Sequence, residues 1–187
     1  MAIHITGDEA ADQVLTDSSF ALLVGMMLDQ QYPMEHAFRG PAKVLARFGN
    51  VDPEAIAAAA PEEFAALCAT PPAVHRFPGS MASRMQELAA LVCGQYGGET
   101  DRLWTEAEDA QDLMKRLLGL PGFGKQKARI FMALLAKRLG VRPDGWEQVA
   151  GDYALDGYRS VADVVDPESL QRVRDHKKQQ KAAAKAG

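Results

Sequence analysis

Apolar side chains recur at helical spacing along most of this chain, and no useful stretch alternates between apolar and polar residues as a strand would. The clearest apolar stripe lies in residues 125–139, where such side chains return every three or four positions: Ala128, Phe131, Met132, Leu135 and Leu139. Residues 20–28 are apolar on all sides, which is typical of a helix buried in the core. The pattern therefore predicts an all-α fold.

Capping residues, prolines and glycines indicate where these helices begin and end. Asp17 or Ser18 can cap the first apolar helix, Thr105 and Glu108 have the spacing of a capping box, and Asp166 with Pro167 can open the last helix. The predicted helices span residues 20–31, 33 to about 47, 53–60, 61–68, 80–96, 105–118 and 125–139, with a last one from 167.

The chain is long enough for one domain with a sizeable hydrophobic core, because it has 187 residues. We expect residues 1–178 to form a single helical domain of two lobes. We expect residues 179–187 to form a basic, disordered tail, since they carry little apolar surface to bury.

Composition and the N-terminus indicate a cytoplasmic protein, or a nucleoid-associated one in a bacterium. The 47% hydrophobic and 25% charged content is ordinary for a soluble domain. The longest apolar run, residues 20–28, is too short for a membrane span, and no basic segment precedes an apolar stretch at the N-terminus. Cys68 and Cys93 are too few for a structural metal site, so we expect no metal.

Charge is distributed unevenly, although the net charge is only −4. Residues 115–142 contain Lys and Arg but neither Asp nor Glu, and the segment from Arg172 onward is also strongly basic, with Asp175 its sole acid. A local positive surface of this kind can bind a nucleic acid by displacing counterions from its phosphates. The alternative is that these basic residues only form solvent-exposed helix faces.

Two predicted helices are joined by a glycine-rich connection within residues 110–139. The connection reads Leu120-Pro121-Gly122-Phe123-Gly124, followed by Lys125, Gln126 and Lys127 at the start of the second helix. Pro121 stops the first helix, and the glycines allow a positive φ and a close approach of another backbone. The N–H groups of the second helix then point outward, which suits a phosphate oxygen. Residues 120–127 are therefore candidate DNA-binding residues.

This segment resembles the helix-hairpin-helix of the HhH-GPD superfamily of base-excision DNA repair glycosylases, which includes endonuclease III and the 3-methyladenine glycosylases. The apolar helix that ends in Gln30 and Gln31 is similar to the family's early helix, and residues 80–98 are similar to the helix that leads toward the hairpin. The resemblance spans residues 18–144 and implies double-stranded, damaged DNA as the partner of a monomeric protein.

The resemblance also implies a catalytic carboxylate. Its distance beyond the hairpin falls on Asp144, where an anion would stabilise positive charge on the deoxyribose or orient water. Pro143-Asp144-Gly145 is equally a strong turn sequence, and the residues after Asp144 do not match the family. Asp152 is the second candidate. Gln31 or Gln30 would fill the space that a flipped base leaves in the duplex.

The resemblance also indicates which chemistry is not expected. Gln126 stands where bifunctional family members carry a catalytic lysine, and an amide cannot form a Schiff base, so we expect a monofunctional glycosylase without lyase activity. The four-cysteine iron–sulfur loop is missing, so we expect no cluster and no cofactor. A monovalent cation at the hairpin carbonyls would be compatible with the resemblance.

Three functions fit these observations. The first is a monofunctional DNA glycosylase with Asp144 as its carboxylate. The second is a noncatalytic DNA-binding or lesion-sensing protein on the same scaffold, which the atypical segment after Asp144 favours. The third is a helical interaction protein whose basic face binds something other than DNA.

Overall fold

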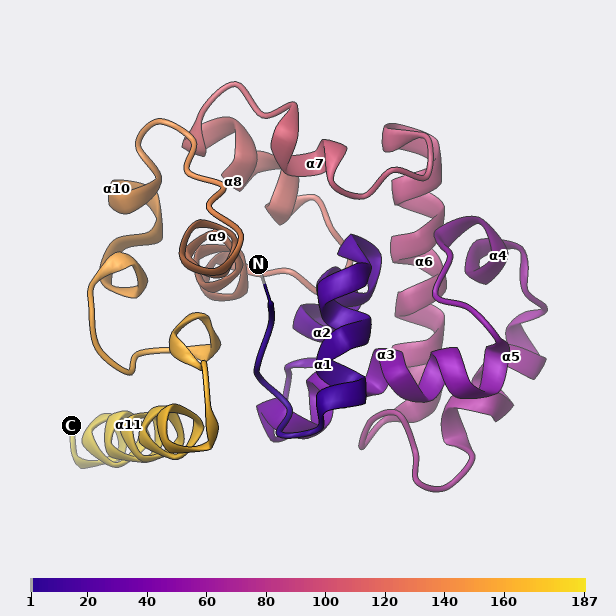
Figure 1. Ribbon diagram of the computed structural model, residues 1–187, viewed down its shortest axis with the longest axis horizontal. Coiled ribbons are helices and arrows are strands. Elements are labelled where there is room, and N and C mark those ends of the chain that lie inside the picture. The colour runs from indigo at the N-terminus through magenta and orange to yellow at the C-terminus, as the bar shows by residue number, and fades with distance from the viewer. Residues whose placement is uncertain (1) are drawn as a thin grey trace.

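The computed structural model describes residues 2–187, and within that range it contains helices and no strand, which confirms the all-α prediction (Figure 1). The α-helices are α1 (Glu9–Asp17), α2 (Ser19–Leu28), α3 (Met34–Phe48), α4 (Pro53–Ala58), α5 (Pro61–Ala69), α6 (Pro78–Tyr96), α7 (Arg102–Thr105), α8 (Ala110–Leu118), α9 (Lys125–Arg138), α10 (Trp146–Ala150) and α11 (Pro167–Ala186). Two short 3-10 helices, η1 (Gly151–Ala154) and η2 (Val161–Asp163), connect α10 to α11.

The helices form two groups that share one core (Figure 1). In the first group α2 packs on α1 and α3, and α6 packs on α4 and α5. In the second group α9 packs on α8, α10, η1 and η2, and α11 packs on η2. Buried apolar residues of both groups belong to a single continuous cluster. The two groups are therefore held together by hydrophobic contacts rather than by a flexible linker.

Helix α2 lies at the centre of this core, as its apolar sequence predicts. Every residue from Phe20 to Leu28 is buried. The Ser18 hydroxyl caps the helix by accepting a hydrogen bond from the Ala21 N–H at 3.0 Å. Gly25 allows the close packing of α3, because a Cβ there would lie 2.5 Å from Cδ1 of Phe38. The helix ends at Leu28, three residues earlier than predicted, so Gln30 and Gln31 lie in the following loop.

The start of α8 differs from the sequence prediction. Thr105 ends the short helix α7 and does not form a capping box with Glu108. Asp109 caps α8 instead, since its carboxylate accepts a hydrogen bond from the Asp112 N–H at 2.8 Å. The spacing of Thr105 and Glu108 fits the capping motif, but α8 begins only at Ala110, and Asp109 is the capping residue directly before it.

The C-terminal segment also differs, because α11 continues as a helix to Ala186 through the segment predicted to be disordered. Residues 178–187 are exposed, so tertiary packing does not hold them. Their Lys, Gln and Ala side chains have high intrinsic helix propensity, and the helix that starts at Asp166 extends into them. At the other end, α1 was not predicted; Asp8 caps it with hydrogen bonds from the N–H groups of Ala10 and Ala11.

In the part of the chain that the structure describes, no helix combines the length and the apolar character that crossing a bilayer requires.

Candidate nucleic-acid interface

The connection between α8 and α9 is a tight turn that buried side chains anchor to the core. Leu120 and Phe123 are buried, and the Phe123 N–H donates to the Leu120 carbonyl at 3.2 Å. The Phe123 ring contacts the Phe131 ring edge-on, with centroids 6.1 Å apart. Phe123 therefore packs in the interior, where it anchors the turn and has no surface with which to stack on a base.

Gly122 supplies the left-handed conformation that this turn requires, with φ of 79°. It also lies against α6, because a Cβ at this position would come within 2.7 Å of Cδ of Arg84. The glycine thus lets the turn meet the first group of helices at close range, as the sequence predicted for a glycine-rich connection.

The start of α9 is open to solvent. Gly124, Lys125 and Gln126 are exposed, and no side chain caps the helix. The first N–H groups of a helix have no intrahelical acceptor, and they carry the positive end of the helix dipole. The turn and the first residues of α9 thus present donors and positive charge on one exposed edge.

The loop after α2 distinguishes between the two candidate glutamines. Gln30 is held inward: its side-chain carbonyl accepts from Nη1 of Arg84 at 3.2 Å, and its backbone carbonyl lies 3.0 Å from Nε2 of His75. Gln31 is exposed and adopts a positive φ of 52°, which is unusual for a residue with a side chain. Of the two, Gln31 is therefore the residue that the loop presents to solvent.

His75 orients this loop as a neutral side chain. Its Nδ1 accepts a hydrogen bond from the Phe77 N–H at 3.0 Å, which leaves the proton on Nε2 for donation to Gln30. Burial lowers the pKa of His75, and hydrogen bonds to the carbonyls of Gln30 and Leu28 partly oppose this effect. The histidine is thus a fixed support of the loop.

Arg84 connects the loop after α2 with the hairpin. Its aliphatic part packs on Gly122, and its guanidinium binds Gln30. The two segments that the sequence assigned to DNA, more than 80 residues apart, are consequently neighbours.

Lys127 does not point toward the exposed edge with Lys125. Its ammonium donates to the Met27 carbonyl at 2.8 Å and lies 5.8 Å from the centre of the Phe123 ring. Burial lowers the pKa of Lys127 to about 8, although the nearby Asp29 carboxylate opposes this shift. Lys127 therefore joins α9 to the last turn of α2, a contact that its place in the basic segment did not indicate.

Asp29 is the carboxylate at this junction. Burial raises its pKa, and the positive charges of Lys127 and Lys177 partly counteract the effect. Glu35 raises the pKa further, and His75 lowers it only in its protonated form. Four separate elements thus bring titratable groups to Asp29, and sequence reasoning missed this cluster because its members lie far apart in the chain.

Gln126 contacts a residue of a small polar groove. Its amide donates to the Tyr153 hydroxyl at 3.0 Å, and Nε of Arg129 donates to the Val149 carbonyl at 3.0 Å. A groove of about 120 Å³ lies beside these residues. Its lining is mostly polar and consists of Arg129, Asp152, Tyr153, Arg159, His176 and Gln180.

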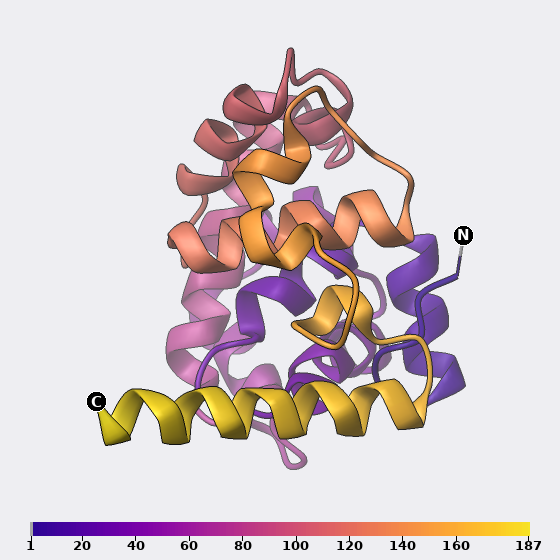
Figure 2. The ribbon, with the colours of Figure 1, turned by 90° about the vertical axis from the view of Figure 1, so that its left-hand side faces the viewer.

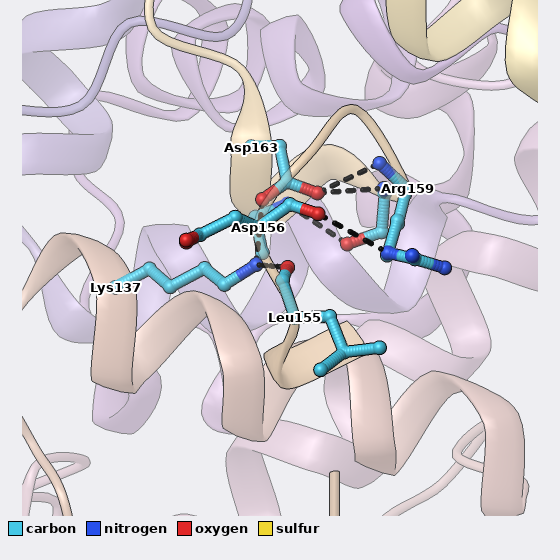
Figure 3. Close-up of polar contacts among 7 residues, drawn as sticks. Lys137, Leu155, Asp156, Arg159 and Asp163 are labelled. Carbon is cyan, nitrogen blue, oxygen red and sulfur yellow. Dashed lines mark hydrogen bonds and ion pairs between the residues drawn. The ribbon is translucent and has the colours of Figure 1, made fainter. Parts of the chain in front are cut away.

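A buried ion pair fixes the segment that carries Arg159 (Figure 3). The Lys137 ammonium lies 2.6 Å from Oδ1 of Asp163 and donates to the Leu155 carbonyl at 2.8 Å. The other oxygen of Asp163 accepts from the N–H groups of Arg159 and Ser160 at 2.8 and 3.1 Å. This network ties residues 155–163 to α9 and so positions one wall of the groove.

The two candidate catalytic carboxylates occupy different surroundings. Asp144 lies in the turn before α10, its side chain is exposed, and its backbone carbonyl accepts from the Ala110 N–H at the start of α8, 3.0 Å away. Gly145 follows with φ of 81°, as expected of a Pro-Asp-Gly turn. Asp152 is also exposed but lines the groove beside Arg129.

The comparison with protein families decides the relationship. A family model, the HhH-GPD superfamily base excision DNA repair protein, matches residues 24–186. The chain belongs to the HhH-GPD superfamily. The match covers the second half of α2, the loop after it, the hairpin and α11, so the Gln31 loop and the hairpin lie within it. No curated protein and no solved structure matches the chain.

Membership of the HhH-GPD superfamily assigns the protein to base excision DNA repair and implies that it binds DNA. Within residues 2–187, no group of three or more His, Cys, Asp and Glu side chains is arranged to hold a metal ion. Cys68 and Cys93 are both free thiols, and burial raises the pKa of Cys68 to about 11.

Proposed function

We propose that this protein is a monofunctional DNA glycosylase that binds duplex DNA and hydrolyses the N-glycosidic bond of a damaged base. The observation that carries the proposal is the juxtaposition of the hairpin with the exposed Gln31 loop, which Arg84 links, in a chain of the HhH-GPD superfamily. The hairpin would hold phosphate oxygens, and Gln31 would occupy the space of the extruded base.

The absence of a lysine at position 126 supports hydrolysis rather than a lyase reaction. The Gln126 amide is hydrogen bonded to Tyr153 and cannot attack a sugar carbon as an amine does. A hydrolytic reaction needs a carboxylate near the sugar, because positive charge develops there as the base departs. The resemblance assigns this carboxylate to Asp144, and Asp152 and Asp29 are the other candidates near the hairpin or the Gln31 loop.

Base release tests the proposed function directly. Labelled duplexes that carry a deaminated, an alkylated or an oxidised base would be incubated with the protein, and alkali would reveal the abasic sites. We expect release from one lesion class and no strand cleavage before alkali. Salt-sensitive binding without release from any duplex would instead support a noncatalytic lesion sensor.

Helix α11 offers a second contact to DNA. In Figure 2, α9 begins on the left side of the molecule, next to the hairpin, and α11 runs along the bottom to end on the same side. The last part of α11 carries the exposed Lys178, Lys181 and Lys185 and no acidic residue. We propose that these lysines lie along the phosphate backbone beside the segment that the hairpin holds.

Salt dependence measures this contact. Replacing Lys178, Lys181 and Lys185 by Gln should reduce the slope of log Kd against log salt by roughly 2–3, since each lost phosphate contact removes about 0.9. The control is Arg142→Gln, which removes a positive charge beyond the opposite end of α9. Equal slopes for the triple variant and the wild type would show that this part of α11 does not contact DNA.

A further inference from the structure

The polar groove beside α9 adjoins a larger hollow in the surface. The groove measures about 120 Å³ and the larger hollow about 340 Å³, and Arg159 and His176 line both. The groove additionally includes Arg129 of α9, whereas the larger hollow includes Arg172 of α11. Basic side chains from three separate segments therefore meet on one part of the surface.

The groove is next to the exposed start of α9. Gln126, the second residue of α9, donates to the hydroxyl of Tyr153, which lines the groove, at 3.0 Å. Arg129 lies one helical turn further along α9. Four residues separate it from Lys125, a distance of roughly 6 Å along the helix axis. The groove thus continues the edge on which the hairpin presents its N–H groups.

The two arginines of the groove keep their outer nitrogens available. Arg129 donates from Nε to the Val149 carbonyl at 3.0 Å, and Arg159 donates from Nε to the Asp156 carbonyl at 3.3 Å. Within residues 2–187 these are the only hydrogen bonds of the two guanidiniums, so the terminal nitrogens have no acceptor. Such planar forks of N–H donors match the oxygens of a phosphate.

Both guanidiniums are held in position by the surrounding chain. Gly151 has φ of 62°, and a Cβ there would collide with Nη2 of Arg129, so the glycine lets this guanidinium lie against the backbone. The Arg159 N–H donates to Asp163 at 2.8 Å, and the Arg159 guanidinium points away from that carboxylate (Figure 3). A ligand that meets fixed donors loses less affinity to ordering them.

His176 adds a polar atom that the chain does not satisfy. Its Nε2 is buried and has no hydrogen-bond partner among the residues that the structure describes. A buried polar atom without a partner is costly and uncommon in a folded protein. Because His176 lines the groove, a ligand there could provide this partner after a rotation of the ring.

Charge distinguishes the groove from the larger hollow. Asp152 is the single carboxylate among the residues that line the groove, and it is exposed, so water screens it. In the larger hollow, Asp156 and Asp175 balance the arginines, and Arg172 is already paired with Glu168 at 2.6 Å. Unpaired positive charge is therefore concentrated in the groove. Its volume has room for several waters of roughly 30 Å³ each, and so for a phosphate group.

We propose that the groove binds a phosphate, held jointly by Arg129 and Arg159 with His176 beside them, and that this phosphate belongs to the DNA strand that the hairpin holds. The assignment rests on the DNA binding of the proposed function and is independent of base release. Successive phosphates of one strand follow at about 3.4 Å along the duplex axis. A strand fixed at the hairpin thus carries another phosphate within the roughly 6 Å that separates the start of α9 from Arg129.

The salt dependence of binding to an undamaged duplex measures this contact. The double variant Arg129→Gln/Arg159→Gln should lower the slope of log Kd against log salt by about 0.9, the value for one phosphate, because the two guanidiniums share it. A loss of about 1.8 would mean that each arginine holds its own phosphate and would contradict a shared site. An unchanged slope would show that the groove does not contact DNA.

Two single variants separate the groove from general effects of charge and folding. Arg172→Gln removes a positive charge from the larger hollow and should leave the slope unchanged; a loss equal to that of the double variant would attribute the effect to net charge. Arg129 also supports α10 through Val149, so Arg159→Gln is measured alone. This variant should keep the wild-type stability and lose roughly half of the 0.9, and a wild-type slope would contradict the proposal.

The same titrations distinguish the groove from the proposed function. Wild-type protein whose affinity for the duplex does not depend on salt contradicts the phosphate contacts of the hairpin and with them the proposed DNA binding. Salt-dependent binding by the wild type, with the same slope in the double variant, contradicts the groove alone.

Inorganic phosphate distinguishes a backbone phosphate from a free one. The ring resonances of His176, assigned with His176→Gln, would be followed by NMR in the wild type and in the double variant. We expect the duplex to shift them in the wild type alone, and inorganic phosphate to act only at far higher concentration. Saturation by inorganic phosphate, with no shift on addition of the duplex, would assign the groove to a free phosphate and overturn its role in DNA binding.

Discussion

Asp163→Asn is expected to lower the free energy of unfolding by about 3–5 kcal/mol, because it leaves the Lys137 ammonium without its counter-charge in a buried position. The two side chains are only 12% and 7% exposed, and their charged atoms lie 2.6 Å apart. An asparagine has a single side-chain oxygen, so it cannot accept both from Lys137 and from the N–H groups of Arg159 and Ser160, which share Oδ2 of Asp163. Chemical denaturation of the two proteins gives the difference directly.

The chain contains a matched control for this effect. Arg172 and Glu168 also lie 2.6 Å apart, but their side chains are 53% and 72% exposed. Solvent screens such a pair, so Glu168→Gln should change stability little. Comparable losses in Asp163→Asn and Glu168→Gln would mean that burial does not set the strength of the Lys137–Asp163 pair.

Gly122→Ala is expected to destabilise the protein by about 1–3 kcal/mol, because the alanine would combine a left-handed backbone with a steric conflict. The new Cβ would lie 2.7 Å from Cδ of Arg84, which must shift away from Gln30 to relieve the contact. The variant should therefore also loosen the loop that carries Gln31, and its affinity for duplex DNA should fall.

Gly124→Ala is the control within the same hairpin. Gly124 has φ of −90°, and a Cβ there would meet no atom within 4 Å. We expect a change in stability of about 0.5 kcal/mol or less, measured by the same denaturation experiment. If Gly122→Ala proves as stable as Gly124→Ala, the packing of the hairpin against Arg84 does not support the fold.

The sequence was most informative where local chemistry determines structure. The uninterrupted apolar run of α2 predicted a buried helix, and the spacing of glycines and proline between α8 and α9 predicted the hairpin, because both signals arise within a few consecutive residues. The cap of α11 at Asp166 and Pro167 is confirmed for the same reason. Family resemblance added the order of these elements along the chain.

The sequence was least informative where distant residues meet. Lys127 was grouped with its basic neighbours, although tertiary contacts turn it toward Met27, 100 positions away. The surroundings of Asp29 could not be predicted either, since the titratable groups near it come from α3, α9, α11 and the segment before α6. An ionisable residue at the end of an otherwise apolar helix was the one local indication of an unusual environment. Helicity in residues 179–186 was missed because the interpretation weighed burial and neglected intrinsic propensity.

The continuous core that joins the two groups of helices affects how a lesion would be found. Because α2 is surrounded by apolar contacts and joined to α9 through Lys127, the two groups of helices have little freedom to rotate relative to each other. A stiff protein cannot close around a base, so the duplex has to bend and unstack instead. That deformation costs least where pairing or stacking is already weak. Discrimination would thus begin in the mechanics of the DNA, before any side chain has contacted the altered base.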